Sequence, residues 1–183
     1  MFLKHPYFFP CELTGGYNKQ GCASNGGVDS IIAINLANIL SYTLSPDGSE
    51  VTAMALVIGK QGYEITPDRA HIFANQDPVR NRANNSYAVP QTVMLDLPDD
   101  ELDTQELTTT LGKGFFLFIV RYSNGKNRVF GLVNGMTLDT EANTSGQEYE
   151  DKNGSVLNFT GKELLKAPLV SNLIADALLE PAS

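Results

Sequence analysis

The sequence predicts a mainly β protein with one main helix, folded as a small β-barrel or β-sandwich that the helix flanks. Two patterns carry this prediction: a strong hairpin pattern in residues 114–133 and a single helical pattern just before it, in residues 98–112. Sixteen glycines and nine prolines suit a chain of short strands and frequent turns. A chain of 183 residues is long enough for one well-buried domain and short for two.

Residues 1–27 are expected to form an extended N-terminal arm. Aromatic residues gather in Pro6–Pro10 and glycine-rich sequence follows, and this composition disfavours a regular element. A cluster of exposed aromatic side chains is unfavourable in water. We therefore expect the segment either to fold over its own domain or to dock on a neighbouring subunit. Its candidate interface residues are Tyr7, Phe8 and Phe9.

Residues 28–170 are expected to form a single β-rich domain. Residues 28–44 alternate between apolar and smaller or polar side chains, and residues 50–58 return after the Ser45–Gly48 turn as a second strand. Residues 66–90 are polar, with weak periodicity, and are expected to be a long loop. The alternative is an extended hairpin or arm that orders only against an acidic neighbour. The candidate interface residues of this segment are Arg69, Ile72, Phe73, Arg80 and Arg82.

A strand and an acidic helix follow the long loop. Val93, Leu95 and Leu97 alternate within residues 91–97 and predict a strand. Residues 98–112 predict a helix, because Pro and Asp start it, acidic residues fill its first turns and Gly ends it. Its outer side is predicted to be an acidic face, either solvated or turned toward a charged partner. The residues of this face are Asp99, Asp100, Glu101, Asp103 and Glu106.

The hairpin is the centre of the predicted fold. Phe115–Val120 does not alternate, so we expect a strand buried on both faces. Ser123–Lys126 supplies an Asn-Gly turn before the second strand in residues 127–133. Residues 155–160 alternate and predict a final strand. The C-terminal tail, residues 171–183, is expected to be mobile or to hold a short helix.

Patterns of catalytic and metal-binding residues are missing from the sequence. No nucleophile elbow, phosphate-binding glycine loop or zinc-protease motif is present. Cys11 and Cys22 form no C-x-x-C pair, and only His5 and His71 accompany them, too few ligands for a zinc site. No run of eighteen apolar residues predicts a membrane span. We expect no enzyme, no metal, no cofactor, and two free thiols in a reducing cytoplasm.

The net charge of −8 restricts the partners of the protein. A surface that holds nucleic acid neutralises phosphates with Lys and Arg, and this composition argues against one. An acidic wall that faces DNA without binding it remains compatible with the charge.

Turn motifs rich in glycine and asparagine follow one another along residues 26–163. They are Gly26–Val28 before Ile34–Ile39, Asn124–Lys126 ahead of Phe130–Leu132, Asn134–Leu138, Ser145–Gly146, Asp151–Gly154 and Phe159–Glu163. In this order the motifs and elements resemble the tail tube proteins of long-tailed bacteriophages and related injection systems. More narrowly, they resemble virion structural proteins of phages of Bacteroidetes-type bacteria.

This resemblance implies a subunit that forms rings, which stack into a tail tube. The long loop, here residues 66–90, would reach the next ring, and an acidic lumen would let genomic DNA pass without specific binding. The expected partners are copies of the chain and other virion tail proteins, in a virion tail built from subunits synthesised in the host cytoplasm. The alternatives are a single-ring tail terminator, connector or baseplate subunit, or a monomeric β-rich module that binds carbohydrate or protein.

Overall fold

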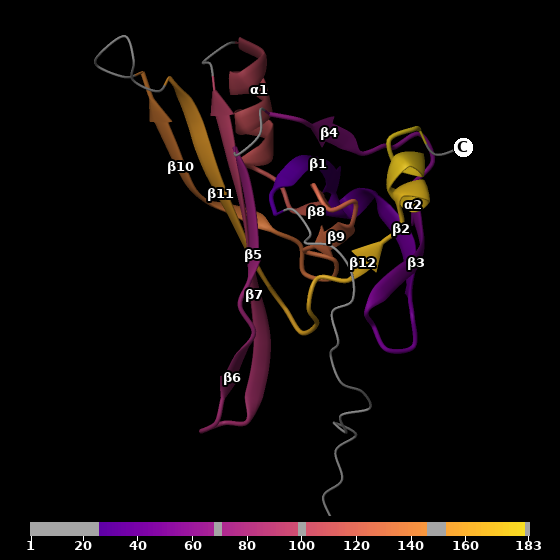
Figure 1. Ribbon diagram of the computed structural model, residues 1–183. Coiled ribbons are helices and arrows are strands. Elements are labelled where there is room, and N and C mark those ends of the chain that lie inside the picture. The colour runs from indigo at the N-terminus through magenta and orange to yellow at the C-terminus, as the bar shows by residue number, and fades with distance from the viewer. Residues whose placement is uncertain (1–25, 68–70, 99–101, 146–152, 182–183) are drawn as a thin grey trace, which may run out of the picture.

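Two β-sheets pack face to face, with the main helix α1 at one end of the sandwich (Figure 1). The computed structural model describes residues 26–67, 71–98, 102–145 and 153–181. The mainly β prediction is confirmed. Neither sheet closes on itself within these residues, so the sandwich alternative describes the fold and the barrel alternative is wrong.

Sheet A contains seven strands and includes the predicted central hairpin. Its neighbouring strands are antiparallel except for β12, which runs parallel to β3. A 3-10 helix, η1 (Leu36–Asn38), divides the predicted first strand region into β1 and β2. In order across the sheet the strands are β2 (Ile39–Leu44), β3 (Glu50–Leu56), β12 (Leu169–Val170), β9 (Asn127–Phe130), β8 (Phe116–Tyr122), β1 (Val28–Asn35) and β4 (Tyr63–Ile65).

Sheet B is antiparallel throughout and contains five strands. Residues 66–90, predicted to be a long loop, instead contribute two short strands and the start of a long one. The alternative of an extended hairpin therefore describes this segment better. The strands are β10 (Thr137–Thr144), β11 (Gly154–Glu163), β7 (Ser86–Pro98) and β5 (Ile72–Gln76), with β6 (Val79–Asn81) pairing with the first residues of β7.

Strand β8 is buried on both faces, as its lack of alternation predicts. Phe118 points into the cluster between the two sheets, where its ring lies 4.9 Å from that of Phe159 on β11. Ile119 points to the other face of sheet A, into a second cluster that includes Ala175 and Leu178. Phe115, which the prediction placed in the same strand, precedes β8 and is 58% exposed.

The predicted Asn-Gly turn joins β8 to β9. Gly125 has φ +77° and its N–H donates to Tyr122 O at 2.9 Å, a backbone conformation that glycine adopts without steric cost. After β9 the chain turns again at Gly131, with φ +68°, where the N–H donates to Gln91 Oε1 at 2.8 Å. This second turn connects sheet A to sheet B.

Helix α1 (Leu102–Leu111) confirms the predicted helix over the described part of residues 98–112. Thr108 and Leu111 are buried, and Leu107 packs partly buried against the cluster between the sheets. The helix ends at Gly112, whose N–H donates to Thr108 O at 2.8 Å. Its apolar side therefore closes one end of the sandwich.

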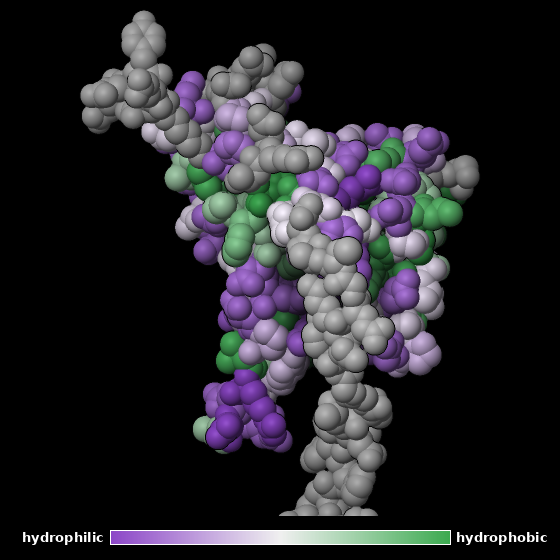
Figure 2. Space-filling model, in the orientation of Figure 1, coloured by the Kyte–Doolittle hydropathy of each residue, from purple (hydrophilic) through white to green (hydrophobic). Residues whose placement is uncertain are grey.

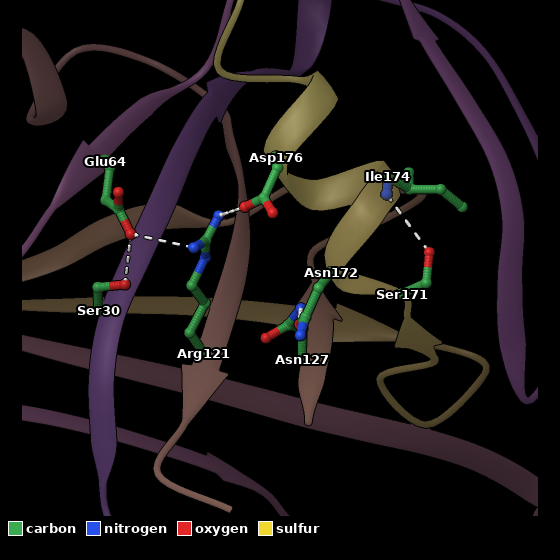
Figure 3. Close-up of polar contacts among 8 residues, drawn as sticks. All are labelled: Ser30, Glu64, Arg121, Asn127, Ser171, Asn172, Ile174 and Asp176. Atoms are coloured by element: carbon green, nitrogen blue, oxygen red, sulfur yellow. Dashed lines mark hydrogen bonds and ion pairs between the residues drawn. The ribbon is translucent and has the colours of Figure 1, made fainter. Parts of the chain in front are cut away.

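The C-terminal segment is part of the domain, and the short-helix alternative is confirmed. Helix α2 (Asn172–Ala177) begins at Ser171, whose Oγ accepts from Ile174 N at 3.3 Å. Arg121 on β8 bridges Asp176 of the helix, at 2.6 Å, and Glu64 of β4, at 3.5 Å (Figure 3). These contacts, with the burial of Ala175 and Leu178, hold α2 on the face of sheet A opposite sheet B.

Asp47 organises the turn between β2 and β3. Its carboxylate accepts hydrogen bonds from Ser45 Oγ at 2.5 Å, Ser49 Oγ at 2.7 Å and Ser49 N at 3.2 Å. These bonds, chiefly the one from Ser45, favour the charged form and lower the pKa of Asp47 from 3.8 to about 2.

We expect the contribution of this turn to stability to depend on pH. Because the folded-state pKa lies below the unfolded value, the stabilisation is present above about pH 4 and is lost as the pH falls through about 2. An NMR titration of the Asp47 carboxyl carbon should give a midpoint near 2. Ser45→Ala should move that midpoint up toward 3.8. A midpoint near 4 in the unmodified protein would contradict the hydrogen-bonded turn.

Candidate assembly surface

The most prominent surface feature is the end of a hairpin, residues 79–88, called the arm below. Its two strands are β6 and the start of β7, paired through Val79↔Ala88, Arg80↔Tyr87 and Asn81↔Ser86. The neighbouring strand β11 reaches along β7 only as far as Val89. The arm is therefore a two-stranded ribbon that extends beyond the sandwich (Figure 1).

Asparagine side chains hold the turn of the arm. Asn81 Oδ1 accepts from Ala83 N at 2.9 Å, and Asn84 Oδ1 accepts from Ser86 N at 3.2 Å. Asn85 has φ +52°, a conformation that asparagine tolerates better than most residues. The asparagine-rich sequence that predicted a loop is therefore the chemistry of a hairpin turn.

The arm buries little of its own surface. Val79 is 54% exposed and Tyr87 is 44% exposed, and Arg80 and Arg82 are also exposed. Figure 2 shows this projection as mainly hydrophilic with a hydrophobic patch on it. Residues 79–88 contain two arginines and no acidic residue in a chain of net charge −8. An isolated two-stranded ribbon is marginal in water, so this arm suits a partner surface.

The predicted interface residues are distributed unevenly. Arg80 and Arg82 lie on the arm, and Phe73 is 53% exposed on β5. Ile72 is buried in the cluster between the sheets, so its side chain is not available to a neighbouring subunit, and this part of the prediction is wrong. The alternation of β5 places Ile72 inward and Phe73 outward. Tyr7, Phe8, Phe9 and Arg69 lie outside the described residues.

Strand β5 forms one edge of sheet B. Asp96 N donates to His71 O at 2.8 Å, and Asp77 N donates to Pro90 O at 3.0 Å. Hydrogen-bonded and non-hydrogen-bonded residue pairs alternate along an antiparallel ladder. Because His71 and Asp77 belong to hydrogen-bonded pairs, Ala74 belongs to a non-hydrogen-bonded pair, and its N–H and C=O point away from β7. Strand β5 therefore presents backbone donors and acceptors at the sheet edge.

Strand β10 forms the opposite edge of sheet B. Its residues 139–144 are all exposed, so this half of the strand extends past the sandwich core. It carries Asp139 and Glu141, charges of the kind that discourage unselective edge pairing. Because every neighbouring pair in the sheet is antiparallel, β10 and β5 run in opposite directions. The two edges are therefore compatible with antiparallel pairing between copies.

The outer face of sheet B carries polar and apolar side chains at its central positions and no lysine or arginine there, and Lys162 is the next outward residue of β11. These positions alternate with the core residues of β7 and β11 and stay partly exposed, so no second layer of described residues covers them. They are Thr92, Met94, Asp96, Val156, Asn158 and Thr160.

The predicted acidic face remains a prediction for most of its members. Asp99, Asp100 and Glu101 lie outside the described residues. Asp103 belongs to α1, and Glu106 is exposed on the same helix.

Comparisons with protein-family models, with curated proteins and with solved structures found no match. Within the described residues, no group of three or more His, Cys, Asp or Glu side chains is placed to hold a metal ion. His5, Cys11 and Cys22 lie outside that part of the chain. None of the described helices has the length and apolar character needed to cross a membrane.

Proposed function

We propose that this protein is a structural subunit that assembles with copies of itself into stacked rings, as in the tail tube of a virion. The observation that carries this proposal is sheet B, an open antiparallel sheet whose edge strands β5 and β10 each pair with one strand among the described residues, with a ribbon that extends from its middle. The resemblance of the turn motifs to tail tube proteins supports the tubular form. The proposal gives the chain no catalytic role.

The two free edges supply the ring contact. Pairing β5 of one copy with β10 of the next joins different surfaces, which makes the contact heterologous, and such contacts produce a ring when the rotation closes. If the ring axis runs roughly along the strands, β5 and β10 of adjacent copies stay antiparallel, so the alternation of sheet B continues across the contact. The ring would then have no unpaired edge in this sheet.

The arm supplies the contact between rings. It continues the direction of β7 beyond the sheet, and β7 is 13 residues long, or about 40 Å. At the other end of β7 the sequence continues with Asp99–Glu101 and the acidic helix. Stacking would bring the two arginines of the arm toward the acidic end of the adjacent ring, and opposite charges favour this head-to-tail order.

The outer face of sheet B would line the lumen. Its central positions in β7 and β11 offer hydroxyl, amide and apolar groups and one carboxylate, that of Asp96. Phosphates are held mainly by Lys and Arg, so a wall of this composition would allow DNA to pass without retaining it.

Electron micrographs of the concentrated protein test this function and should show rings and tubes. Ala74→Pro removes the N–H that β5 directs outward, a change that an edge strand tolerates when the N–H faces solvent. We expect this variant to remain folded by circular dichroism and to lose ring formation. A monomeric mass for the unmodified protein at high concentration, measured by light scattering, would overturn the proposal. Single rings that never stack would favour the terminator or connector alternative.

Shortening the arm tests its role in stacking. Deleting residues 79–80 and 87–88 together removes two facing pairs, keeps Asn81 and Ser86 of the turn, and leaves the register of the rest of β7 unchanged. We expect folded subunits that form rings but no tubes. Normal tubes from this variant would exclude the arm from stacking.

A charge-matched pair of variants separates charge from length. Arg80→Gln with Arg82→Gln should weaken stacking, and it should do so most strongly at low salt, where charge attraction is least screened. The control, Lys60→Gln with Lys113→Gln, changes the net charge equally at exposed positions away from the arm. Equal effects of the two pairs would show that only net charge matters.

A further inference from the structure

An apolar groove lies where the end of β2, the turn after β9 and the linker between β11 and β12 meet. The groove has a volume of about 310 Å³. Apolar side chains dominate its lining, and its polar members are Gln91, Asn134, Glu163 and Lys166. The apolar members are Leu44, Val129, Leu132, Val133, Leu164, Leu165 and Pro168.

Three large hydrophobic side chains at the groove are exposed. Leu164 is 72% exposed, Val133 is 56% exposed and Leu165 is 50% exposed. A contiguous exposed apolar patch marks a binding surface more often than scattered exposed residues do. These exposed fractions are what the neighbouring described residues leave uncovered.

Hydrogen bonds fix both walls of the groove. Glu163 Oε1 accepts from Val133 N at 3.1 Å and from Asn134 N at 2.9 Å, which holds the turn after β9. In the linker, Ala167 O accepts from Arg128 Nη1 at 2.8 Å, and Ala167 N donates to Gln76 Oε1 of β5 at 2.8 Å. The exposed leucines therefore belong to a preformed surface, which lowers the entropic cost of binding.

We propose that Pro6–Pro10 of the same chain, with the sequence Pro-Tyr-Phe-Phe-Pro, occupies this groove. The groove needs an apolar occupant, and the other stretches outside the described residues are short and contain no run of aromatic residues. Aromatic rings supply a large apolar area on few rotatable bonds. The flanking prolines restrict the backbone further, which favours an extended bound form.

The length of the chain permits this contact within one subunit. Val28 pairs with Tyr122, and Leu132 lies two strands across and about six residues along the sheet, on the order of 20–25 Å away. Residues 11–25 span up to about 50 Å when fully extended. The segment is therefore long enough to reach the groove of its own chain, and this docking does not require ring assembly.

A single introduced tryptophan tests the docking in the full-length chain, which contains no tryptophan. We expect Phe8→Trp to give blue-shifted emission and low quenching by acrylamide. Adding Leu165→Lys should shift the emission to that of the denatured chain, whereas adding Leu173→Lys, at an 81% exposed position on α2, should not. Solvent-exposed emission from Phe8→Trp alone, or a blue shift that survives Leu165→Lys, would overturn the proposal.

A disulfide between the segment and the groove separates contact within one chain from contact between copies. Cys11 directly follows Pro10, so Leu165→Cys in a Cys22→Ser background should form an intramolecular disulfide with Cys11. The control, Leu173→Cys in the same background, should not form one under the same mild oxidation. Mass spectrometry of proteolytic peptides from the monomer band gives the readout. A disulfide found only in dimers, or a blue shift lost on dilution, would assign the segment to a neighbouring copy and overturn the proposal.

Discussion

Phe118→Ala is expected to lower the free energy of unfolding by about 3–5 kcal/mol. The side chain is fully buried and joins the two sheets, since it extends from β8 in sheet A and its ring lies 4.9 Å from that of Phe159 in sheet B. A second aromatic neighbour, Phe116, lies at 6.1 Å. Truncation removes the buried area and these ring contacts, and it leaves a cavity that close packing fills only in part.

Urea unfolding followed by circular dichroism measures this loss, at a concentration where light scattering gives a monomeric mass. Phe115→Ala is the matched control, because it removes the same side chain three positions earlier in the sequence, where 58% is exposed. We expect the control to lose less than about 1 kcal/mol. Equal losses for the two variants would contradict the packing of the sheets through Phe118.

Gly131→Ala is expected to lower the free energy of unfolding by about 2–5 kcal/mol. A residue with a side chain at φ +68° costs about 1–2 kcal/mol. The new Cβ would also lie 2.6 Å from Met136 Cγ and 2.9 Å from backbone atoms of Gly135 and Met136. Backbone cannot move aside as a flexible side chain does, so overpacking adds about 1–3 kcal/mol.

Gly125→Ala separates the two costs of the Gly131 variant. Gly125 has a similar φ, +77°, but a Cβ there would meet no atom within 4 Å. This control should therefore lose only the conformational part, about 1–2 kcal/mol. The same denaturant series compares both variants, and a Gly131→Ala loss no larger than that of the control would show that the turn relaxes around the methyl group.

The central hairpin was predictable from the sequence because its signals are local. The run from Phe116 to Val120 has no polar interruption, and a strand with two buried faces needs none. The Asn124-Gly125 pair supplies the positive φ that a tight turn requires. Such features depend on neighbours in the sequence, and they could be read without knowing what packs against them.

The arm was predicted only as the alternative to a long loop, because its strands satisfy each other through backbone pairing and have no buried face. Asn81 has low strand propensity, and Pro78 interrupts the segment between β5 and β6. The usable signals were Asn84-Asn85 as a turn and the regular alternation that begins near Val89. The burial of Ile72 likewise depends on its pairing with β7, where it faces Leu95. The residues next to Ile72 in the sequence do not indicate this pairing.

The choice between a barrel and a sandwich depends on contacts far apart in sequence. Strand β12 inserts between β3 and β9, and this placement brings residues 169–170 beside residues near 50 and 127. No local pattern indicates that pairing. For the candidate assembly surface, the exposed arginines and Phe73 were found from composition, whereas the free edges of sheet B and the groove depend on how the strands are ordered.

Strand β7 is continuous from the arm to the core, and this limits where the gene can gain or lose codons. Adding one residue between Val89 and Leu97 would exchange inward and outward side chains over the rest of the strand and expose Val93 and Leu95. Paired additions on the two sides of the arm turn change only its reach. Relatives of this protein can therefore differ in arm length by facing pairs while the sandwich stays the same.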